Sequence, residues 1–236
     1  MPAPKQTLIT LALAAVLILL FFSIRLFKLS RSLSSYKHYW NEKTAAPMQE
    51  GSLLYVALGD STAQGIGASK PEKGYVGLIA KQLSAQTGRP VHVINLSVSG
   101  AGTEQLTNDQ LPKLKKINLP DDAIVTLSVG ANDLANFNAD QFLAQTETLF
   151  SQLPLRTLVA DIPYFGGGRE KGREANVIKA SAIIDRVARK YNLRVAPLHQ
   201  TTKDEDSLLA YGADFFHPSN KGYQNWHKAF ESLLKQ

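Results

Sequence analysis

Two segments of this 236-residue chain, more than 150 positions apart, carry residue types that suit nucleophilic catalysis. Ser61 stands directly after an apolar run, in a turn that begins with Gly59. A serine hydroxyl is a weak nucleophile unless a neighbouring base takes its proton. His217 is the matching base, and Asp214, three residues earlier, is able to accept a hydrogen bond from its Nδ1–H within one turn. The three side chains predict a Ser–His–Asp triad, which attacks carbonyl carbon.

These residues can act together only if the fold brings them to one place, and the apolar pattern predicts how. Short β-rich runs occupy 53–58, 91–96, 123–129, 156–162 and 193–197, and between them lie helical patterns at 75–86, 104–117, 140–151 and 174–191. A last helix carries Tyr223, Trp226, Phe230 and Leu233 on one face. This alternation predicts an α/β domain with a parallel sheet covered by helices on both faces. In such sheets the site lies beyond the carboxyl ends of the strands.

Four polar segments occupy those positions in order. They are Gly59–Thr62, Asn95–Gly100 and Gly130–Asp133 after the first three strands, and Asp214–Ser219 before the last helix. Together they resemble the four sequence blocks of the SGNH (GDSL) hydrolase family, over about residues 53–234. The resemblance implies a three-layer, flavodoxin-like α/β/α sandwich with a five-stranded parallel sheet. It also implies a serine esterase or lipase-like enzyme acting on small acyl esters, O-acetylated glycans or lysophospholipids.

The resemblance further implies three donors for the oxyanion. They are the backbone N–H groups of Ser61 and Gly100 and the side-chain amide of Asn132, which match the family's positions. Asp60 and Asp133 adjoin these positions, and we expect them to brace loops through hydrogen bonds to backbone amides.

Other interpretations of the same residues stay open. Taken singly, Ser61, Asn132, Asp214 and His217 fit ordinary roles as helix caps, helix-entry residues and turn formers. It is their joint occurrence in register with five strands that favours catalysis. His199, after the fifth strand, is the alternative base, although no acid precedes it at matching spacing. The same sheet could instead form a non-catalytic module that binds a glycan or a partner, and acyl transfer or thioester hydrolysis would use the same residues.

Several classes of site are excluded or disfavoured by what the chain lacks. Without cysteine there is no disulfide framework, thiolate zinc site or cysteine nucleophile. The chain has no G-x-S-x-G elbow, no P-loop and no H-E-x-x-H, and Gly65-Ile66-Gly67 lacks the third glycine of a dinucleotide site. A flavodoxin-like nucleotide binder would need the missing phosphate loop. The predicted mechanism requires no cofactor and no metal.

The N-terminal segment predicts a membrane anchor. Leu8 to Ile24 is uncharged, and extension to Phe27 gives 20 residues, which span roughly 30 Å as a helix. We expect a tail at 1–7, a transmembrane helix at 8–27 with the bilayer as its partner, a linker at 28–52, and the hydrolase domain at 53–236. A cleaved signal peptide is the alternative, but the apolar stretch is longer than usual and no small-x-small site follows. The linker could also be a juxtamembrane extension of the helix.

Charge supports this division and argues against nucleic acid as a partner. Residues 1–52 hold six Lys/Arg and two Asp/Glu, whereas residues 53–236 hold 20 and 18, so the net +6 belongs mostly to the N-terminal segment. The basic residues after the span favour a cytoplasmic domain by the positive-inside rule. They could equally lie against anionic headgroups, so the sequence leaves the side open. A glycine-rich segment with three cations, at 163–173, suggests either a mobile flap over an acyl pocket or a solvated loop.

Overall fold

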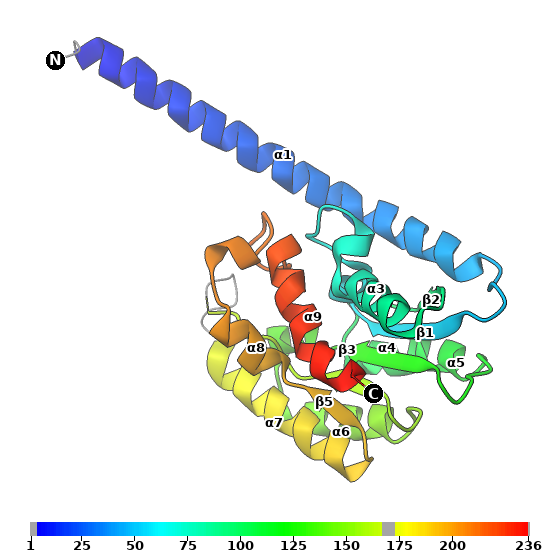
Figure 1. Ribbon diagram of the computed structural model, residues 1–236. Coiled ribbons are helices and arrows are strands. Elements are labelled where there is room, and N and C mark those ends of the chain that lie inside the picture. Colours follow the sequence, from blue (N-terminus) through cyan, green and yellow to red (C-terminus); the bar gives the residue numbers. More distant parts are fainter. Residues whose placement is uncertain (1–3, 167–172, 236) are drawn as a thin grey trace.

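A single parallel sheet organises the globular part of the protein (Figure 1). The computed structural model describes residues 4–166 and 173–235. The strands are β1 (Leu53–Gly59), β2 (Val91–Asn95), β3 (Ile124–Ser128), β4 (Leu158–Ala160) and β5 (Arg194–Ala196), in the order β2-β1-β3-β4-β5. All four pairings are parallel. The predicted five-stranded α/β fold is confirmed, while most of the glycine-rich segment predicted as a flap, residues 167–172, lies outside the described residues.

Helices cover both faces of this sheet because side chains alternate along each strand. In β1 the side chains of Leu54, Val56 and Leu58 join one core cluster, and those of Tyr55 and Ala57 join the other. The first cluster is covered by α4 (Thr103–Asp109), α5 (Leu111–Leu114), α6 (Ala139–Phe150) and α7 (Glu174–Lys190). The second is covered by α3 (Tyr75–Thr87), α8 (Leu198–Asp204) and α9 (Asn220–Leu234). β1 is therefore an interior strand, between β2 and β3, and is buried on both faces.

The helix predicted over 104–117 is interrupted, and α4 and α5 take its place. Pro112 has no N–H to continue the helical ladder, and its ring clashes with the carbonyl four residues earlier. At the break, the side chain of Gln110 turns inward and is completely buried against the end of β1. The hydrogen bonds between the Gln110 side chain and the Gly59 backbone therefore stabilise the break between α4 and α5.

The segment predicted as a linker is largely helical, which corrects the expectation for residues 28–52. The first helix, α1, runs without interruption from Pro4 to Ala45, so the predicted alternative, a juxtamembrane extension, describes the structure better. Its C-terminal part packs on the domain, where Tyr36 Oη donates to the Ala68 carbonyl at 2.8 Å and Trp40 Nε1 donates to the Gln64 carbonyl at 2.9 Å. Trp40 is only 4% exposed. These contacts with the domain stabilise the C-terminal part of α1 as a helix, although its sequence has little apolar periodicity.

The N-terminal part of α1 leaves the domain and stands apart from it (Figure 1). By length and composition it is apolar enough to cross a membrane, and a signal sequence would have the same properties. Its large apolar side chains, from Leu8 to Phe27, are exposed. This half of α1 has no apolar core to pack against within the described chain.

Candidate active site

The turn after β1 holds Ser61 at the sheet edge. Gly59 has φ +148°, and a Cβ there would lie 2.4 Å from the Ser128 carbonyl oxygen, so only glycine fits. Asp60 follows as the N-cap of the short helix α2 (Ser61–Gln64), its Oδ1 accepting from the Thr62 amide at 2.8 Å. Ser61 is the first residue of α2 and 5% exposed. The alternative in which Ser61 is the helix cap is therefore wrong, since Asp60 is the N-cap, and the Ser61 hydroxyl is left available for another partner.

That partner is His217, from the loop before α9. His217 Nε2 lies 2.9 Å from Ser61 Oγ, and His217 Nδ1 lies 2.6 Å from Asp214 Oδ2. With Asp214 accepting from Nδ1–H, the tautomer assigned to the imidazole leaves Nε2 free to accept the Ser61 proton. The sequence predicted that these three side chains would lie together, and the structure places them in one hydrogen-bonded chain.

Local geometry holds Asp214 in its ionised form. Burial by itself would raise the pKa of this carboxyl, but the hydrogen bond and charge of His217, together with two backbone hydrogen bonds, outweigh burial and the pKa is lowered. The two backbone donors are the amides of Phe216 and His217, which donate to Asp214 Oδ1, each at 3.1 Å. The other Asp214 oxygen is left to His217, as a carboxylate that orients an imidazole requires.

A glycine that the sequence analysis passed over packs against the histidine loop. Gly67 has φ +95°, and a Cβ on it would lie 2.4 Å from the Pro218 carbonyl oxygen and 2.9 Å from His217 Cβ. Next to it, the Ile66 carbonyl accepts from the buried Tyr223 hydroxyl at 2.6 Å. The loop after α2 is thus pressed against the segment that carries His217. The sequence does not indicate this role for Gly67, because Gly65-Ile66-Gly67 by itself suggests only an incomplete dinucleotide motif.

Two of the predicted oxyanion donors, Asn132 and Gly100, lie on the loops next to Ser61. Asn132, at the start of η2 (Asn132–Asn136), donates through Nδ2 to the Ala101 carbonyl at 3.0 Å and to Asp60 Oδ2 at 3.3 Å. The amide of Asn132 therefore adjoins both the residue before Ser61 and the residue after Gly100. Gly100 has φ +82° and open space where a Cβ would be.

The two aspartates act as the sequence predicted. Asp60 accepts from the Thr62 amide, and Asp133 accepts from the Thr103 amide at 3.1 Å. Burial raises the pKa of both carboxyls, although the hydrogen bonds from Thr62 and Thr103 oppose this shift. Both side chains fasten the loops at the carboxyl ends of β1 and β3.

Buried glutamines, which no spacing in the sequence pointed to, brace the same loops. Gln110 Nε2 donates to the Gly59 carbonyl at 2.7 Å, and its Oε1 accepts from the Gly59 amide at 3.0 Å. Gln64 Nε2 donates to the Ser97 carbonyl at 2.9 Å, and its Oε1 accepts from Ser99 Oγ at 2.8 Å. These side chains satisfy backbone groups at the ends of β1 and β2, where the sheet ladder stops.

The other histidines have different surroundings. His199, the alternative base, lies with Nε2 3.5 Å from Glu174 Oε1 and with its ring edge-on to Tyr164. His227 Nε2 is 2.7 Å from Gln82 Oε1. It is His217 that is hydrogen bonded to Ser61. Among the described residues, no group of three or more His, Asp or Glu side chains converges as a metal site would require.

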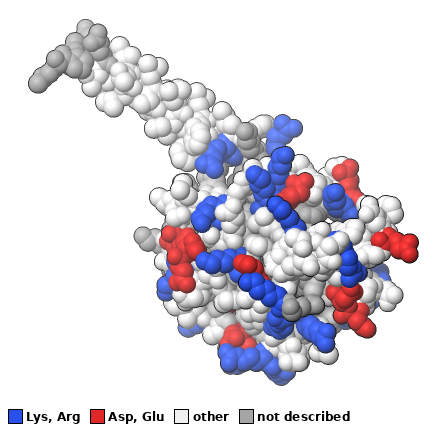
Figure 2. Space-filling view, viewed as in Figure 1, with Lys and Arg blue, Asp and Glu red and all other residues white. Residues whose placement is uncertain are grey.

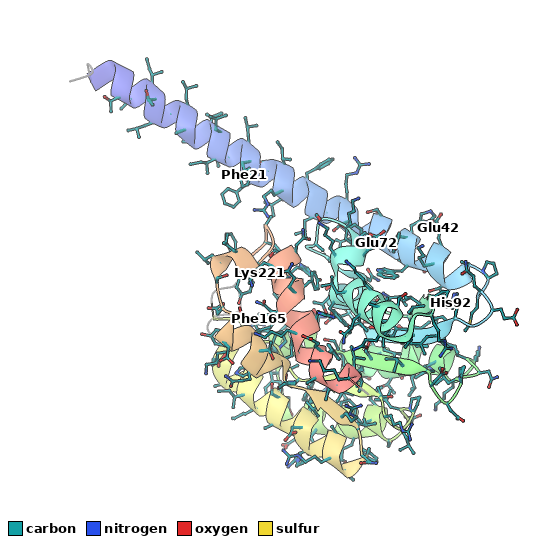
Figure 3. The ribbon with its side chains drawn as sticks, in the orientation of Figure 1. Phe21, Glu42, Glu72, His92, Phe165 and Lys221 are labelled. Carbon is teal, nitrogen blue, oxygen red and sulfur yellow. The ribbon has the colours of Figure 1, made fainter. Side chains whose placement is uncertain are left out.

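Two hollows of opposite character flank Ser61 and Asn132. A pocket rich in aromatic side chains has about 40 Å³ of free space and includes Ser61, Tyr164, Phe165, Tyr211, Phe216 and Trp226 in its lining. Phe165, labelled in Figure 3, stacks on Phe216 with ring centroids 5.8 Å apart. A wider, polar groove includes Asn132, Glu104, Asn108, Asn136, Gln141 and Gln145. The arrangement offers a small apolar space on one side and hydrogen-bonding groups on the other.

Comparison with known sequences finds a family match over most of the globular domain. The sequence profile of the GDSL-like Lipase/Acylhydrolase family matches residues 57–224. No protein among the curated sequences is similar enough to match the chain. The matched range contains β2 to β5, the end of β1, and Ser61, Gly100, Asn132, Asp214 and His217.

Solved structures of low sequence identity share the fold. LAE5, an α/β hydrolase enzyme from the metagenome of Lake Arreo, Spain, is 19% identical with a TM-score of 0.63, over 79% of this chain and 96% of its own. TesA is 20% identical with a TM-score of 0.63, over 77% of this chain and 98% of its own. Axe2, an acetylxylan esterase from Geobacillus stearothermophilus, is 18% identical with a TM-score of 0.60, over 80% and 97%.

Proposed function

The chain belongs to the GDSL-like lipase/acylhydrolase family and is a serine ester hydrolase, and from that premise we propose that it is a membrane-anchored esterase whose nucleophile is Ser61. In this proposal His217 is the general base and acid, and Asp214 orients it. The observation that carries the proposal is the hydrogen-bonded chain from Ser61 Oγ through His217 to Asp214, with distances of 2.9 and 2.6 Å.

The proton movements follow from the tautomer. Ser61 Oγ attacks the ester carbonyl carbon while its proton passes to His217 Nε2. The imidazolium then gives this proton to the departing alcohol, and an acyl group remains on Ser61. A water molecule, deprotonated by the same nitrogen, hydrolyses the acyl–enzyme and releases the acid. Throughout, the ionised Asp214 accepts from His217 Nδ1–H and stabilises the positive ring.

Charge on the carbonyl oxygen needs donors that are in place before attack. We assign this role to the backbone amides of Ser61 and Gly100 and to Asn132 Nδ2. The Ser61 amide lies in the first turn of α2, where a helix has no carbonyl of its own for the N–H. Asn132 Nδ2 makes a long, 3.3 Å bond to Asp60 and a shorter one to Ala101. The longer bond is the one that an oxyanion would replace.

The hollows favour a short acyl group on a polar alcohol. A water molecule needs about 10–15 Å³ of such free space. The roughly 40 Å³ of the aromatic pocket is therefore enough for about three non-hydrogen atoms, the number in an acetyl group. The neighbouring groove has amide and carboxylate side chains suited to hydroxyl groups. Among the substrates expected from the sequence, O-acetylated glycans fit better than lysophospholipids. Axe2, which shares the fold, is described as an acetylxylan esterase.

We assign the anchor to residues 8–27 of α1. Its apolar side chains are exposed on all sides of the helix, for example Leu8 at 72% and Leu17 at 66%. Exposure of that extent in water is costly, and burial in a bilayer removes it. Arg25, with its guanidinium 5.4 Å from the Phe21 ring, lies near the end of the span, where its stem reaches the interface.

A fluorophosphonate probe tests the nucleophile directly. The intact protein should be labelled covalently at Ser61, Ser61→Ala should not be labelled, and His217→Ala should react far more slowly. Ser151→Ala, in an exposed serine at the end of α6, is the matched control and should be labelled like the wild type. Folded protein that resists the probe would favour the non-catalytic binding module. A panel of p-nitrophenyl esters should then show activity falling as the acyl group lengthens beyond acetyl.

A further inference from the structure

Exposed apolar side chains gather on the segment that leads to the proposed catalytic histidine. Leu208 and Leu209, in the short helix η4 (Leu208–Ala210), are 66% and 80% exposed, and Phe215 is 40% exposed. We call these three residues the apolar lip. Adjacent exposed leucines are unfavourable on a surface that meets only water. The lip therefore calls for an apolar partner.

One residue of the lip, Phe215, contacts α1 near the end of its apolar half. The rings of Phe215 and Phe22 are 6.4 Å apart between centroids. Phe22 is five residues before Phe27, the end of the proposed span, which is about 7–8 Å along a helix axis. If α1 crosses a bilayer over residues 8–27, Phe215 is thereby carried past the edge of the acyl-chain region, to a depth of at most about 7–8 Å for an upright helix. In Figure 3, Phe21 projects from α1 on the side that faces the 208–216 segment.

The relative position of lip and span is held by contacts between α1 and the domain, among which the Trp40 side chain is buried. Tyr36, Trp40 and Thr44 fasten the C-terminal part of α1 to the domain, with Thr44 Oγ1 accepting from the Asn95 amide at 3.1 Å. Because α1 is one uninterrupted helix, its N-terminal part cannot turn independently of these contacts. The domain therefore has one face toward the membrane, and the lip is on that face.

Charge supports the same orientation. A groove between α1 and the lip segment is lined by Phe21, Ile24 and Phe27, together with Arg25, Arg31 and Lys221. Lys and Arg side chains gather where the helix meets the globular part (Figure 2), and Lys221 lies at the start of α9 beneath α1 (Figure 3). Arg31 and Lys221 lie outside the span and Arg25 lies near its end, so these cations are placed to meet the phosphates of a membrane surface while Phe21 and Ile24 meet the acyl chains.

From these observations we propose that the apolar lip inserts into the surface of the same bilayer that α1 crosses, so that the lipid interface is a second docking surface of the domain. The lip also borders the site. Ala210 and Tyr211 line the aromatic pocket directly after Leu209, and Phe215 stands between Asp214 and His217. Phe215 has φ +54° and is 40% exposed, whereas the next residue, Phe216, lines the pocket together with Ser61. The mouth of the pocket would thus be held at the membrane surface.

This inference rests on the proposed anchor but not on catalysis, and it can be tested in a Ser61→Ala background. The chain has no cysteine, so one introduced cysteine is a unique labelling site. The full chain carrying Leu209→Cys, labelled with an environment-sensitive nitrobenzoxadiazole dye, is reconstituted in phosphatidylcholine–phosphatidylglycerol nanodiscs. Quenching by lipids with a nitroxide near the headgroup then reports contact with the interface. Circular dichroism checks that each labelled variant is folded.

Two further labels complete the test. Leu155→Cys is the matched control, since Leu155 is 74% exposed and precedes β4, at the amino edge of the sheet. Leu17→Cys marks the span itself. We expect quenching at 209 at least about three-fold stronger than at 155, with the label at 17 shielded from water-soluble quencher. Quenching at 209 no stronger than at 155, with 17 shielded, would overturn the docking proposal alone. If the label at 17 is open to water, both the anchor and the docking are wrong.

Discussion

Replacing Gly67 by alanine should damage the proposed catalytic geometry without touching any of its functional groups. An alanine Cβ would lie 2.4 Å from the Pro218 carbonyl oxygen and 2.9 Å from His217 Cβ. Contacts below 3.0 Å are essentially never seen for a Cβ, and 3.4 Å is ordinary. The backbone at Pro218 must therefore retreat by about 0.6–1.0 Å, the difference between these distances. His217 is the preceding residue and must move with it.

The size of the effect follows from the bond that this movement breaks. His217 Nε2 and Ser61 Oγ are 2.9 Å apart, and adding the required shift gives about 3.5–3.9 Å. A side-chain contact of that length is no longer a hydrogen bond. Misplacement of about 1 Å in an active site can cost roughly 10²-fold in rate, or about 2.7 kcal/mol of transition-state stabilisation. The positive φ adds about 1–2 kcal/mol of lost stability, because alanine disfavours that conformation.

The assay is kcat/KM for p-nitrophenyl acetate with the full chain in detergent, beside urea unfolding of the same sample. Gly88→Ala is the matched control, because Gly88 also has positive φ (+68°) but has nothing within 4 Å of its Cβ position. We expect about a 10²-fold loss for Gly67→Ala and a change within about two-fold for Gly88→Ala, with stability lowered in both. A folded Gly67→Ala protein that kept a third or more of the wild-type kcat/KM would refute the reasoning.

Three other perturbations have definite expected outcomes. Asp214→Asn should lower kcat by about 10³–10⁴-fold in steady-state kinetics, because an amide no longer stabilises the Nδ1–H tautomer and the imidazolium of His217; activity within ten-fold would contradict the assignment. Trp40→Ala should lower the free energy of unfolding by about 3–5 kcal/mol in urea titrations, because it removes a buried side chain. Trp40→Phe should lower it by only about 1 kcal/mol, because it loses the hydrogen bond to the Gln64 carbonyl but keeps most of the side-chain volume. Equal losses in the two variants would show that packing is not the main contribution of Trp40 to stability. Burial raises the pKa of Asp161 to about 6 from 3.8, so the folded state binds this proton more tightly than the unfolded state, and the resulting stability is present below about pH 4 and is lost as the pH rises through 6. We therefore expect the free energy of unfolding, measured in urea, to fall between pH 4 and pH 7 by up to about 3 kcal/mol less in Asp161→Asn than in the wild type. The same change with pH in both proteins would contradict this prediction.

Local patterns were enough to predict the strands, most of the helices and the polar segments between them. Each β-rich run became a strand within two residues at either end, because period-two burial on both faces of a parallel sheet leaves a continuous apolar run. The break at Gln110 was missed although Pro112 is visible in the sequence, since the apolar spacing continues on both sides of it. The hydrogen bonds that stabilise the break join Gln110 to the backbone of Gly59, which lies 51 residues away in the sequence.

The candidate site divides in the same way. The types and order of Ser61, Asp214 and His217 indicated what chemistry they could do, because the carboxyl ends of parallel strands meet at one edge. Their distances, the pressure of Gly67 on the histidine loop and the packing of Trp40 under α2 depend on contacts across 24 to 157 residues. Periodicity reports only how a segment alternates between core and solvent. Which distant segment fills that core, and therefore where the lip and the first helix lie, is decided when the whole chain closes around the sheet.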